Sequence, residues 1–139
     1  MRILIINGPN LNLLGVREPE VYGSTTFSDF YSNLQQRFPN VELHHFQSNH
    51  EGALIDKLHE VGFTFNGIVL NAGGFAHTSI ALADAINAIT TPVVAVHISN
   101  TFARESYRHH DAIAGKCKGL IAGLGLEGNA LAIKYLVNQ

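Results

Sequence analysis

Three short polar segments carry residue types that could perform chemistry, and each directly follows a run of mostly apolar residues. They are Asn7–Asn10, Asn71–Gly74 and His97–Asn100. Asparagine amides donate and accept hydrogen bonds, and a histidine can hold or release a proton near neutral pH. Asn, Gly and Pro are also ordinary turn residues, so one such segment alone would indicate only a turn. Three of them at one edge of a sheet would instead indicate a binding site with acid–base capacity.

The first of these segments opens a long connection, residues 7–24, that carries further polar side chains. Strand-to-helix connections usually have roughly 2 to 6 residues, so one this long is either functional or disordered. Its apolar residues, Leu11, Leu13 and Leu14, argue against disorder. We therefore expect a hinged lid over the site that brings its own chemistry. The side chains it would bring are Arg17, Glu18 and Tyr22, between glycines 15 and 23.

Composition limits the possible partners. The formal net charge is -2 and no run of Lys or Arg is present, so nothing indicates binding to nucleic acid or to an anionic membrane. Charged residues make up 14% of the chain, against about 25% in typical proteins. Mean hydropathy is +0.11 and 46% of residues are apolar, so we expect a homo-oligomer whose subunits cover much of one another's surface.

The length of 139 residues predicts a single catalytic domain, residues 1–139. Cys117 is the only cysteine, so no intramolecular disulfide can form. The N-terminus has the pattern of a strand rather than of a targeting segment, which predicts a soluble, cytoplasmic protein.

Short apolar runs alternate with amphipathic stretches, which is typical of strand–helix units and a parallel sheet. We expect an α/β, flavodoxin-like fold: a five-stranded parallel sheet with helices on both faces. In that fold ligands bind beyond the carboxyl ends of the strands, where the first and third strands are neighbours. The expected strands are Arg2–Ile6, Val41–Gln47, Gly67–Asn71, Pro92–His97 and Gly119–Ala122.

The expected helices lie between these strands. Thr26 with Asp29 predicts the first helix start, and Ser48 with Glu51 predicts a capping box at the second. The others are expected at Ser79–Ile89 after Thr78, at about Thr101–Arg108, and from about Gly128 to Val137.

Motifs for other chemistries are absent or incomplete. Residues Gly123–Gly128 match G-x-G-x-x-G, but the dinucleotide fingerprint also needs a further strand and an acidic residue about 20 positions on, and the sequence ends at Gln139. The glycines are better explained by tight turning and helix packing. There is no G-x-S-x-G, G-x-x-x-x-G-K-[ST] or H-E-x-x-H motif.

The eight histidines do not predict a metal site. Neither His44 with His45 nor His50 with His59 has a spacing that converges on one ion. The cluster His109–Asp111 is expected to be a solvated or interface patch. No lysine ends a strand, which leaves Schiff-base chemistry without support.

Several motifs together resemble the type II 3-dehydroquinate dehydratases over nearly the whole chain. They are Gly8–Gly15, Arg17–Pro19, Tyr22–Gly23, Gly73-Gly74-x-x-His77-Thr78-Ser79, His97–Asn100, Ala103–Glu105, Arg108–His110 and Gly123-Leu124-Gly125-x-x-Gly128. The resemblance implies an enzyme of the shikimate pathway that removes water from 3-dehydroquinate by anti elimination through an enolate, giving 3-dehydroshikimate. It also implies no metal, no imine, no cofactor, and trimers assembled into a dodecamer.

The resemblance assigns the base to Tyr22, which would take the proton next to the ketone. A free tyrosine has a pKa of about 10, so positive charge from Arg17 and Arg104 is expected to favour its phenolate. It also implies that Asn10 holds a water at the carbonyl oxygen, and that His97 protonates the departing hydroxyl.

Other matching positions would bind the substrate's carboxylate and hydroxyls. Glycines 73 and 74 would allow close approach of the substrate ring. Asp84 matches an acidic residue that reaches a neighbouring subunit's site. The remaining binding positions are Asn71, His77, Arg108 and the backbone amides of Ile98 and Ser99.

Two positions depart from the family pattern. Ala95 stands where a glutamate is expected, which puts in doubt the hydrogen-bond network that orients His97 and the water at Asn10. Ala83 replaces an arginine beside Asp84, which affects the expected subunit contacts. Two alternatives remain open: a non-catalytic flavodoxin-like module that binds flavin or a nucleotide, and a purely structural assembly subunit.

Overall fold

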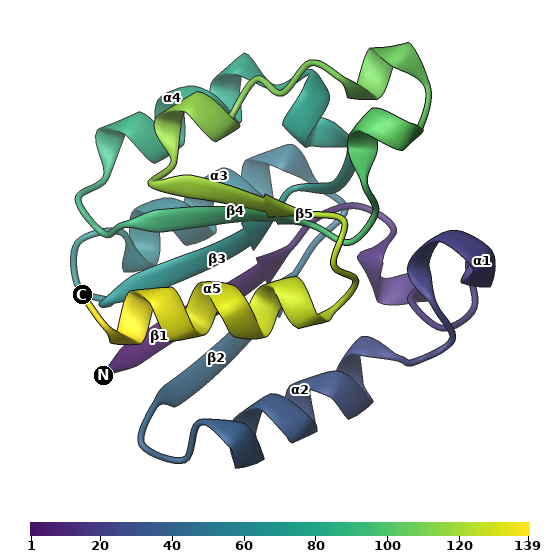
Figure 1. The fold of residues 1–139 in the computed structure, drawn as a ribbon. Coiled ribbons are helices and arrows are strands. Elements are labelled where there is room, and N and C mark those ends of the chain that lie inside the picture. The colour runs from purple at the N-terminus through teal and green to yellow at the C-terminus, as the bar shows by residue number, and fades with distance from the viewer.

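Five parallel strands form one sheet in the computed structural model, which describes residues 1–139 (Figure 1). Their order is β2-β1-β3-β4-β5, and every neighbouring pair is parallel. This is the flavodoxin-like order, with the first and third strands adjacent, so the predicted fold class is confirmed. The strands are β1 (Arg2–Asn7), β2 (Glu42–Gln47), β3 (Gly67–Asn71), β4 (Val93–His97) and β5 (Gly119–Ala122).

The three central strands are almost fully buried, as their apolar sequences require, whereas β2 and β5 at the two edges are partly exposed. Register places Asn7 beside Asn71, the last residues of β1 and β3. Two buried amides therefore end neighbouring strands at the same edge of the sheet.

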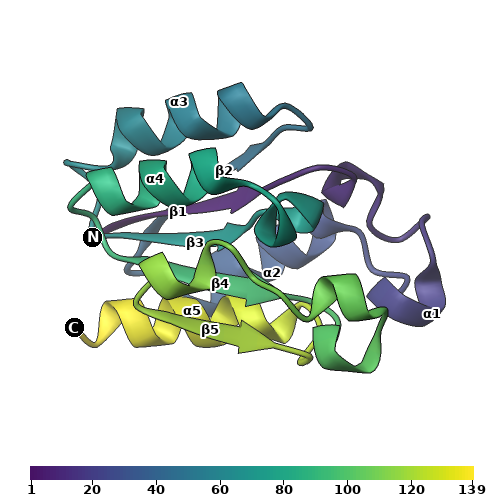
Figure 2. The same cartoon turned by 90° about the horizontal axis from the view of Figure 1, so that it is seen from above.

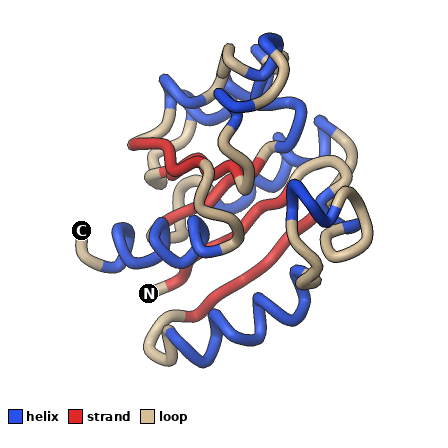
Figure 3. Tube along the Cα trace, turned by 45° about the vertical axis from the view of Figure 1, so that its right-hand side comes forward, coloured by secondary structure: helices blue, strands red, loops and turns tan.

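Helices cover both faces of the sheet (Figures 1 and 2). In Figure 1, α5 (Glu127–Val137) crosses in front of the strands and α3 (Glu51–Val61) lies behind them. One apolar cluster joins α2 (Phe27–Arg37) and α5 to the sheet, and a second joins α3 and α4 (Ile80–Ala88) to its other face. Burial of each large apolar side chain contributes about 1.5–3 kcal/mol, so these clusters hold the strand ends in place. The helices stay on the outside of the strands, as the trace in Figure 3 shows.

Of the two helix caps predicted from the sequence, the structure confirms one. Thr26 caps α2 as predicted, because its hydroxyl accepts the N–H of Asp29. The predicted capping box of Ser48 with Glu51 was wrong. The Ser48 hydroxyl accepts a hydrogen bond from the N–H of His50, while the carboxylate of Glu51 accepts one from the hydroxyl of Ser79. That same Ser79 hydroxyl accepts the N–H of Leu82 and caps α4, which begins one residue after the expected start.

The connections contain short helical turns. The segment after β1 holds the turn η1 (Leu11–Leu13) and a four-residue helix, α1 (Pro19–Tyr22). The single helix predicted at Thr101–Arg108 was wrong, because two separate turns, η3 (Thr101–Ala103) and η4 (Ser106–Arg108), occupy that stretch. Two more turns are η2 (Gly73–His77) and η5 (Ala114–Lys116). No helix is long and apolar enough to cross a membrane, since the longest have 11 residues.

The loops after β1 and β3 are in close contact, which requires glycine. A Cβ atom at Gly8 would lie 2.5 Å from the carbonyl oxygen of Ala72, and one at Gly73 would lie 3.0 Å from that of Pro9. Gly123 and Gly125 instead form the turn after β5, where their N–H groups donate to the carbonyls of residues 97 and 98. The G-x-G-x-x-G pattern thus ties the β5 turn to the end of β4.

Candidate active site

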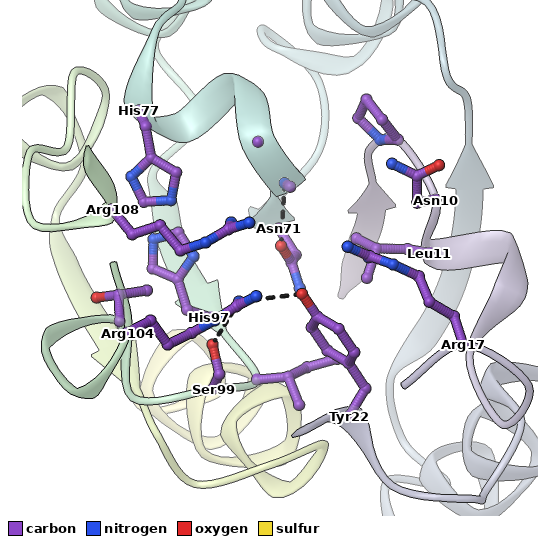
Figure 4. A pocket seen from close by; sticks show the side chains of 15 residues that line it. Asn10, Leu11, Arg17, Tyr22, Asn71, His77, His97, Ser99, Arg104 and Arg108 are labelled. Atoms are coloured by element: carbon purple, nitrogen blue, oxygen red, sulfur yellow. Dashed lines mark hydrogen bonds between the residues drawn. The ribbon is translucent and has the colours of Figure 1, made fainter. Parts of the chain in front are cut away.

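A polar pocket lies beyond the carboxyl ends of β1, β3 and β4 (Figure 4). Its volume is about 140 Å³, which suits a small molecule and is far too small for a dinucleotide. Only three of its 15 lining residues are hydrophobic, so it is built for a ligand with many polar groups. The lining residues are Pro9, Asn10, Leu11, Arg17, Tyr22, Asn71, Gly73, Gly74, His77, His97, Ile98, Ser99, Thr101, Arg104 and Arg108.

Tyr22 enters the pocket from α1 and lies between two arginines (Figure 4). Nη1 of Arg104 donates to its hydroxyl oxygen at 3.0 Å and to the Ser99 hydroxyl at 3.1 Å. The guanidinium of Arg17 lies over the Tyr22 ring, 4.7 Å from its centre. Two permanent positive charges next to one phenol stabilise its anionic form.

The chain around Tyr22 is held by its own turns and by the core. Leu11 and Leu14 are buried in the α2–α5 cluster, although the third leucine of the segment, Leu13, is largely exposed. Helix α1 follows Glu18, which has a left-handed φ of 40°, and it ends at Gly23, with a φ of 84°. These two sharp turns aim the short helix, and hence Tyr22, back over the strand ends.

His97 ends β4 and is 8% exposed. Its Nε2 lies 2.9 Å from a carboxylate oxygen of Asp111. The expectation of a solvated or interface patch at His109–Asp111 was therefore wrong for Asp111, which is partly buried behind the pocket. Burial favours the neutral acid, but hydrogen bonds from His97 and from the N–H groups of Ala114 and Ile113 outweigh it and lower the pKa of Asp111.

His77 stacks on His97, with ring centres 5.6 Å apart and planes within 13°. Nδ1 of His77 lies 2.7 Å from the carbonyl oxygen of His110 and therefore donates to it. In the neutral ring this leaves Nε2 of His77 as a hydrogen-bond acceptor. The side-chain carbonyl of Asn71 accepts a hydrogen bond from the N–H of Gly73 at 3.1 Å. The side-chain nitrogen of Asn71 is thereby left free to donate to a ligand.

Further donors stand at the end of β4. The N–H groups of Ile98 and Ser99 donate to no acceptor within the protein, and both residues line the pocket. Arg108 also lines it and bonds the carboxylate of Glu105 through Nε at 2.7 Å. Burial opposes the charge on Arg108, but Glu105 outweighs that effect and raises the pKa of Arg108. Free N–H groups and a fixed guanidinium are typical of a carboxylate-binding site.

Asn10 stands opposite, on the β1 side of the pocket (Figure 4). It has a left-handed φ of 70°, and its backbone N–H donates to the side chain of Asn49. The side-chain amide of Asn10 makes no hydrogen bond within the protein, so it is available to a ligand or a water.

Asp84 is the one predicted site residue that the structure does not bring to the pocket, since it lies exposed on α4. Ala95 and Ala83 are buried and contribute no polar group. No group of three or more His, Cys, Asp or Glu side chains is arranged to hold a metal ion.

The sequence interpretation missed four residues. Pro9, Leu11 and Thr101 line the pocket, and they lie in or beside segments already singled out. Asp111 had no local signal, because it stands 14 positions from the histidine it contacts.

Comparison with known proteins gives one consistent result. The family described as Dehydroquinase class II matches residues 1–137. The chain is 55% identical over 138 residues to the 3-dehydroquinate dehydratase of Bacillus pumilus, covering 98% of this chain and 94% of that one. It is 54% identical over 140 residues to the 3-dehydroquinate dehydratase of Exiguobacterium, covering 100% and 96%. The structure of a type II dehydroquinase from Butyrivibrio crossotus superposes with a TM-score of 0.95 at 42% identity, over 99% of this chain and 97% of that one.

Proposed function

The chain belongs to the class II dehydroquinase family and is a 3-dehydroquinate dehydratase, a hydro-lyase, and we propose that Tyr22 is its base and His97 its acid. The substrate is a ring with a ketone, hydroxyls and a carboxylate, and the product is its dehydrated enone, 3-dehydroshikimate. The observation that carries the assignment is the contact of Arg104 with the Tyr22 oxygen at 3.0 Å, inside a pocket that also contains His97.

Proton abstraction comes first. Removing a proton next to a ketone needs an anionic oxygen, and the Tyr22 phenolate is stabilised by Arg104 at its oxygen and by Arg17 over its ring. A charged guanidinium only donates hydrogen bonds, so it favours the anion over the neutral phenol. The proton moves to the Tyr22 oxygen, and the electron pair of the C–H bond forms the enolate.

The enolate oxygen needs a donor that is in place before the reaction. The free amide of Asn10 serves by holding a water against that oxygen. One such preorganised donor is worth about 2.7–4 kcal/mol of transition-state stabilisation.

Loss of water completes the reaction. A proton passes from His97 to the hydroxyl oxygen as the C–O bond breaks, and the enolate collapses to the conjugated ketone. The carboxylate and the hydroxyls of the substrate are bound by the N–H groups of Ile98 and Ser99 together with Asn71, His77 and Arg108. Gly73 and Gly74 let the ring approach the chain closely.

The non-catalytic alternatives lack support. A flavin or nucleotide binder needs more room than about 140 Å³ and free amides for a phosphate, whereas Pro9 interrupts the loop after β1. A purely structural subunit gives no reason for a phenol, two imidazoles and three guanidiniums to line one pocket.

The test is to add 3-dehydroquinate to the purified chain and to follow the conjugated enone of the product by ultraviolet absorbance. Turnover that is lost in Tyr22→Phe and strongly reduced in His97→Ala supports the assignment, and Arg37→Gln, on the exposed side of α2, serves as the control. Full turnover in Tyr22→Phe would place the base elsewhere.

We further propose that the enzyme is a cytoplasmic dodecamer built of trimers, in which Asp84 reaches the neighbouring subunit's pocket. The low charge content and the exposed position of Asp84 support this. Mixing Asp84→Ala with Tyr22→Phe subunits should then restore some activity, because one kind of mixed site has both residues. Full activity in a monomer confirmed by light scattering would refute the shared site. Cell fractionation tests the location.

A further inference from the structure

Asp111 is fixed in place by both of its carboxylate oxygens. Oδ1 accepts the N–H groups of Ile113 and Ala114, at 3.0 and 2.9 Å, and so closes the turn before η5. The same turn is anchored by Ile113, which is 1% exposed, and by the N–H of Ala112, which donates to the carbonyl of Ala76 at 2.7 Å. Oδ2 is thereby held at 2.9 Å from Nε2 of His97.

His97 has no other hydrogen bond from its side chain. Ala95, which stands two residues earlier in β4, is buried and offers only a methyl group. Nδ1 of His97 has no hydrogen-bond partner in the protein. Oδ1 of Asn129 is the only fully buried side-chain nitrogen or oxygen without a partner, so Nδ1 of His97 is not fully buried. The open space that His97 lines is the pocket.

We propose that Asp111 is the positioning residue of the acid: it accepts the Nε2–H of His97 and thereby directs Nδ1–H at the departing hydroxyl. The inference rests on the proposed role of His97. As the C–O bond breaks, its electron pair leaves with the oxygen, which takes the Nδ1 proton and departs as water. The imidazole becomes neutral and keeps Nε2–H on Asp111. Before the next turnover Tyr22 releases its proton to solvent and His97 takes one up at Nδ1.

The charged groups around His97 show what Asp111 adds. His77 stacks on the ring at 5.6 Å, and Arg104 and Arg108 line the same pocket, where the carboxylate of Glu105 lies against both arginines rather than against His97. Asp111 is the carboxylate that contacts the His97 ring, so its negative charge is placed to offset the positive charge that His97 carries as the acid. Tyr22 supplies negative charge only as phenolate. Cys117 feels the charge of Asp111, and burial together with that charge raises the pKa of Cys117 to about 12, so it stays a neutral thiol.

The kinetic test is Asp111→Asn, which keeps a carbonyl for the turn before η5 and removes the charge. We expect kcat to fall about 10- to 100-fold, a share of what general acid catalysis contributes. KM should change by less than about twofold, because Asp111 does not line the pocket. Exchange of the proton next to the ketone should persist. In the plot of kcat against pH, the decline at high pH, where the acid loses its proton, should shift to lower pH by about one unit. Asp56→Asn, exposed on α3, is the matched control.

The outcomes separate the two hypotheses. An unchanged kcat and an unchanged high-pH limb in Asp111→Asn, with His97→Ala impaired, would overturn the role of Asp111 alone. Retained turnover in His97→Ala would instead overturn the acid, and with it the proposed function. A residue that merely closes the turn would lower stability without moving the pH limb.

A measurement on the unmodified enzyme covers the case in which Asp111→Asn does not fold. Magic-angle-spinning NMR of protein labelled with ¹⁵N-histidine reports which ring nitrogen carries the proton, and His97→Ala assigns the signal. The proposal requires neutral His97 to be protonated at Nε2. Neutral His97 protonated at Nδ1 would overturn it.

Discussion

Replacing Arg104 by glutamine removes the positive charge that the base depends on. The guanidinium joins α1 to the residues after β4, because one nitrogen donates to both Tyr22 and Ser99. Glutamine has no charge, and its amide nitrogen ends two bonds short of the Nη1 atom that contacts Tyr22, so Arg104→Gln removes both the charge and the contact. Comparison with Arg104→Lys, which keeps the charge, therefore tests whether charge stabilises the phenolate.

The expected size of the effect follows from the geometry. A hydrogen bond to a charged group contributes about 1.5–3 kcal/mol, and each 1.36 kcal/mol of barrier changes a rate about tenfold. The Arg104 side chain is only 16% exposed, so solvent screens the interaction weakly. We therefore expect kcat to fall roughly 10- to 150-fold. Because the base must be deprotonated, the limb of activity at low pH should move to higher pH.

Ultraviolet detection of the product enone gives kcat across the pH range. Arg37→Gln is the control, because Arg37 pairs with Glu127 on the surface and should change the rate little. Arg104→Lys should recover part of the loss, since it restores the charge without the planar fork. If Arg104→Gln lowered kcat without moving the low-pH limb, Arg104 would bind substrate rather than activate Tyr22, and our reasoning about the base would be wrong.

Three further predictions concern the reaction and the single cysteine. Tyr22→Phe should abolish both turnover and deuterium exchange next to the ketone, whereas His97→Ala should slow water loss while exchange continues; NMR of recovered substrate distinguishes the two, and exchange surviving in Tyr22→Phe would contradict the assignment. Borohydride added during turnover should leave the enzyme active and without a substrate adduct by mass spectrometry, because no lysine lines the pocket; a trapped lysine would contradict the enolate route. Cys117, with its pKa raised to about 12, should react with thiol reagents at pH 8 much more slowly in the folded chain than after unfolding, and equally rapid labelling of both would contradict the raised pKa.

Much of the fold was predictable because short apolar runs alternate regularly with amphipathic stretches, and each run forms one strand of a single parallel sheet. The strand limits agree with the prediction to within one residue at each end. Helix starts were less predictable, since capping groups have competing partners. The carboxylate of Glu51 bonds Ser79, 28 positions away, instead of its own helix. The residues next to a helix start do not show whether a capping side chain will bind a distant partner instead.

The candidate site also has features that the sequence determined and features that it did not. Sequence alone determined that the residues after β1, β3 and β4 share one pocket, because parallel strands end at the same edge and the order of strands makes those ends neighbours. It also determined the family through motifs spread along the chain. Only the tertiary structure decided which groups touch. Arg104 reaches Tyr22 across 82 positions, and Asp111 reaches His97 from a turn whose own sequence indicates only a polar patch. Such contacts depend on how loops pack against one another, and loop packing has no period that a sequence could display.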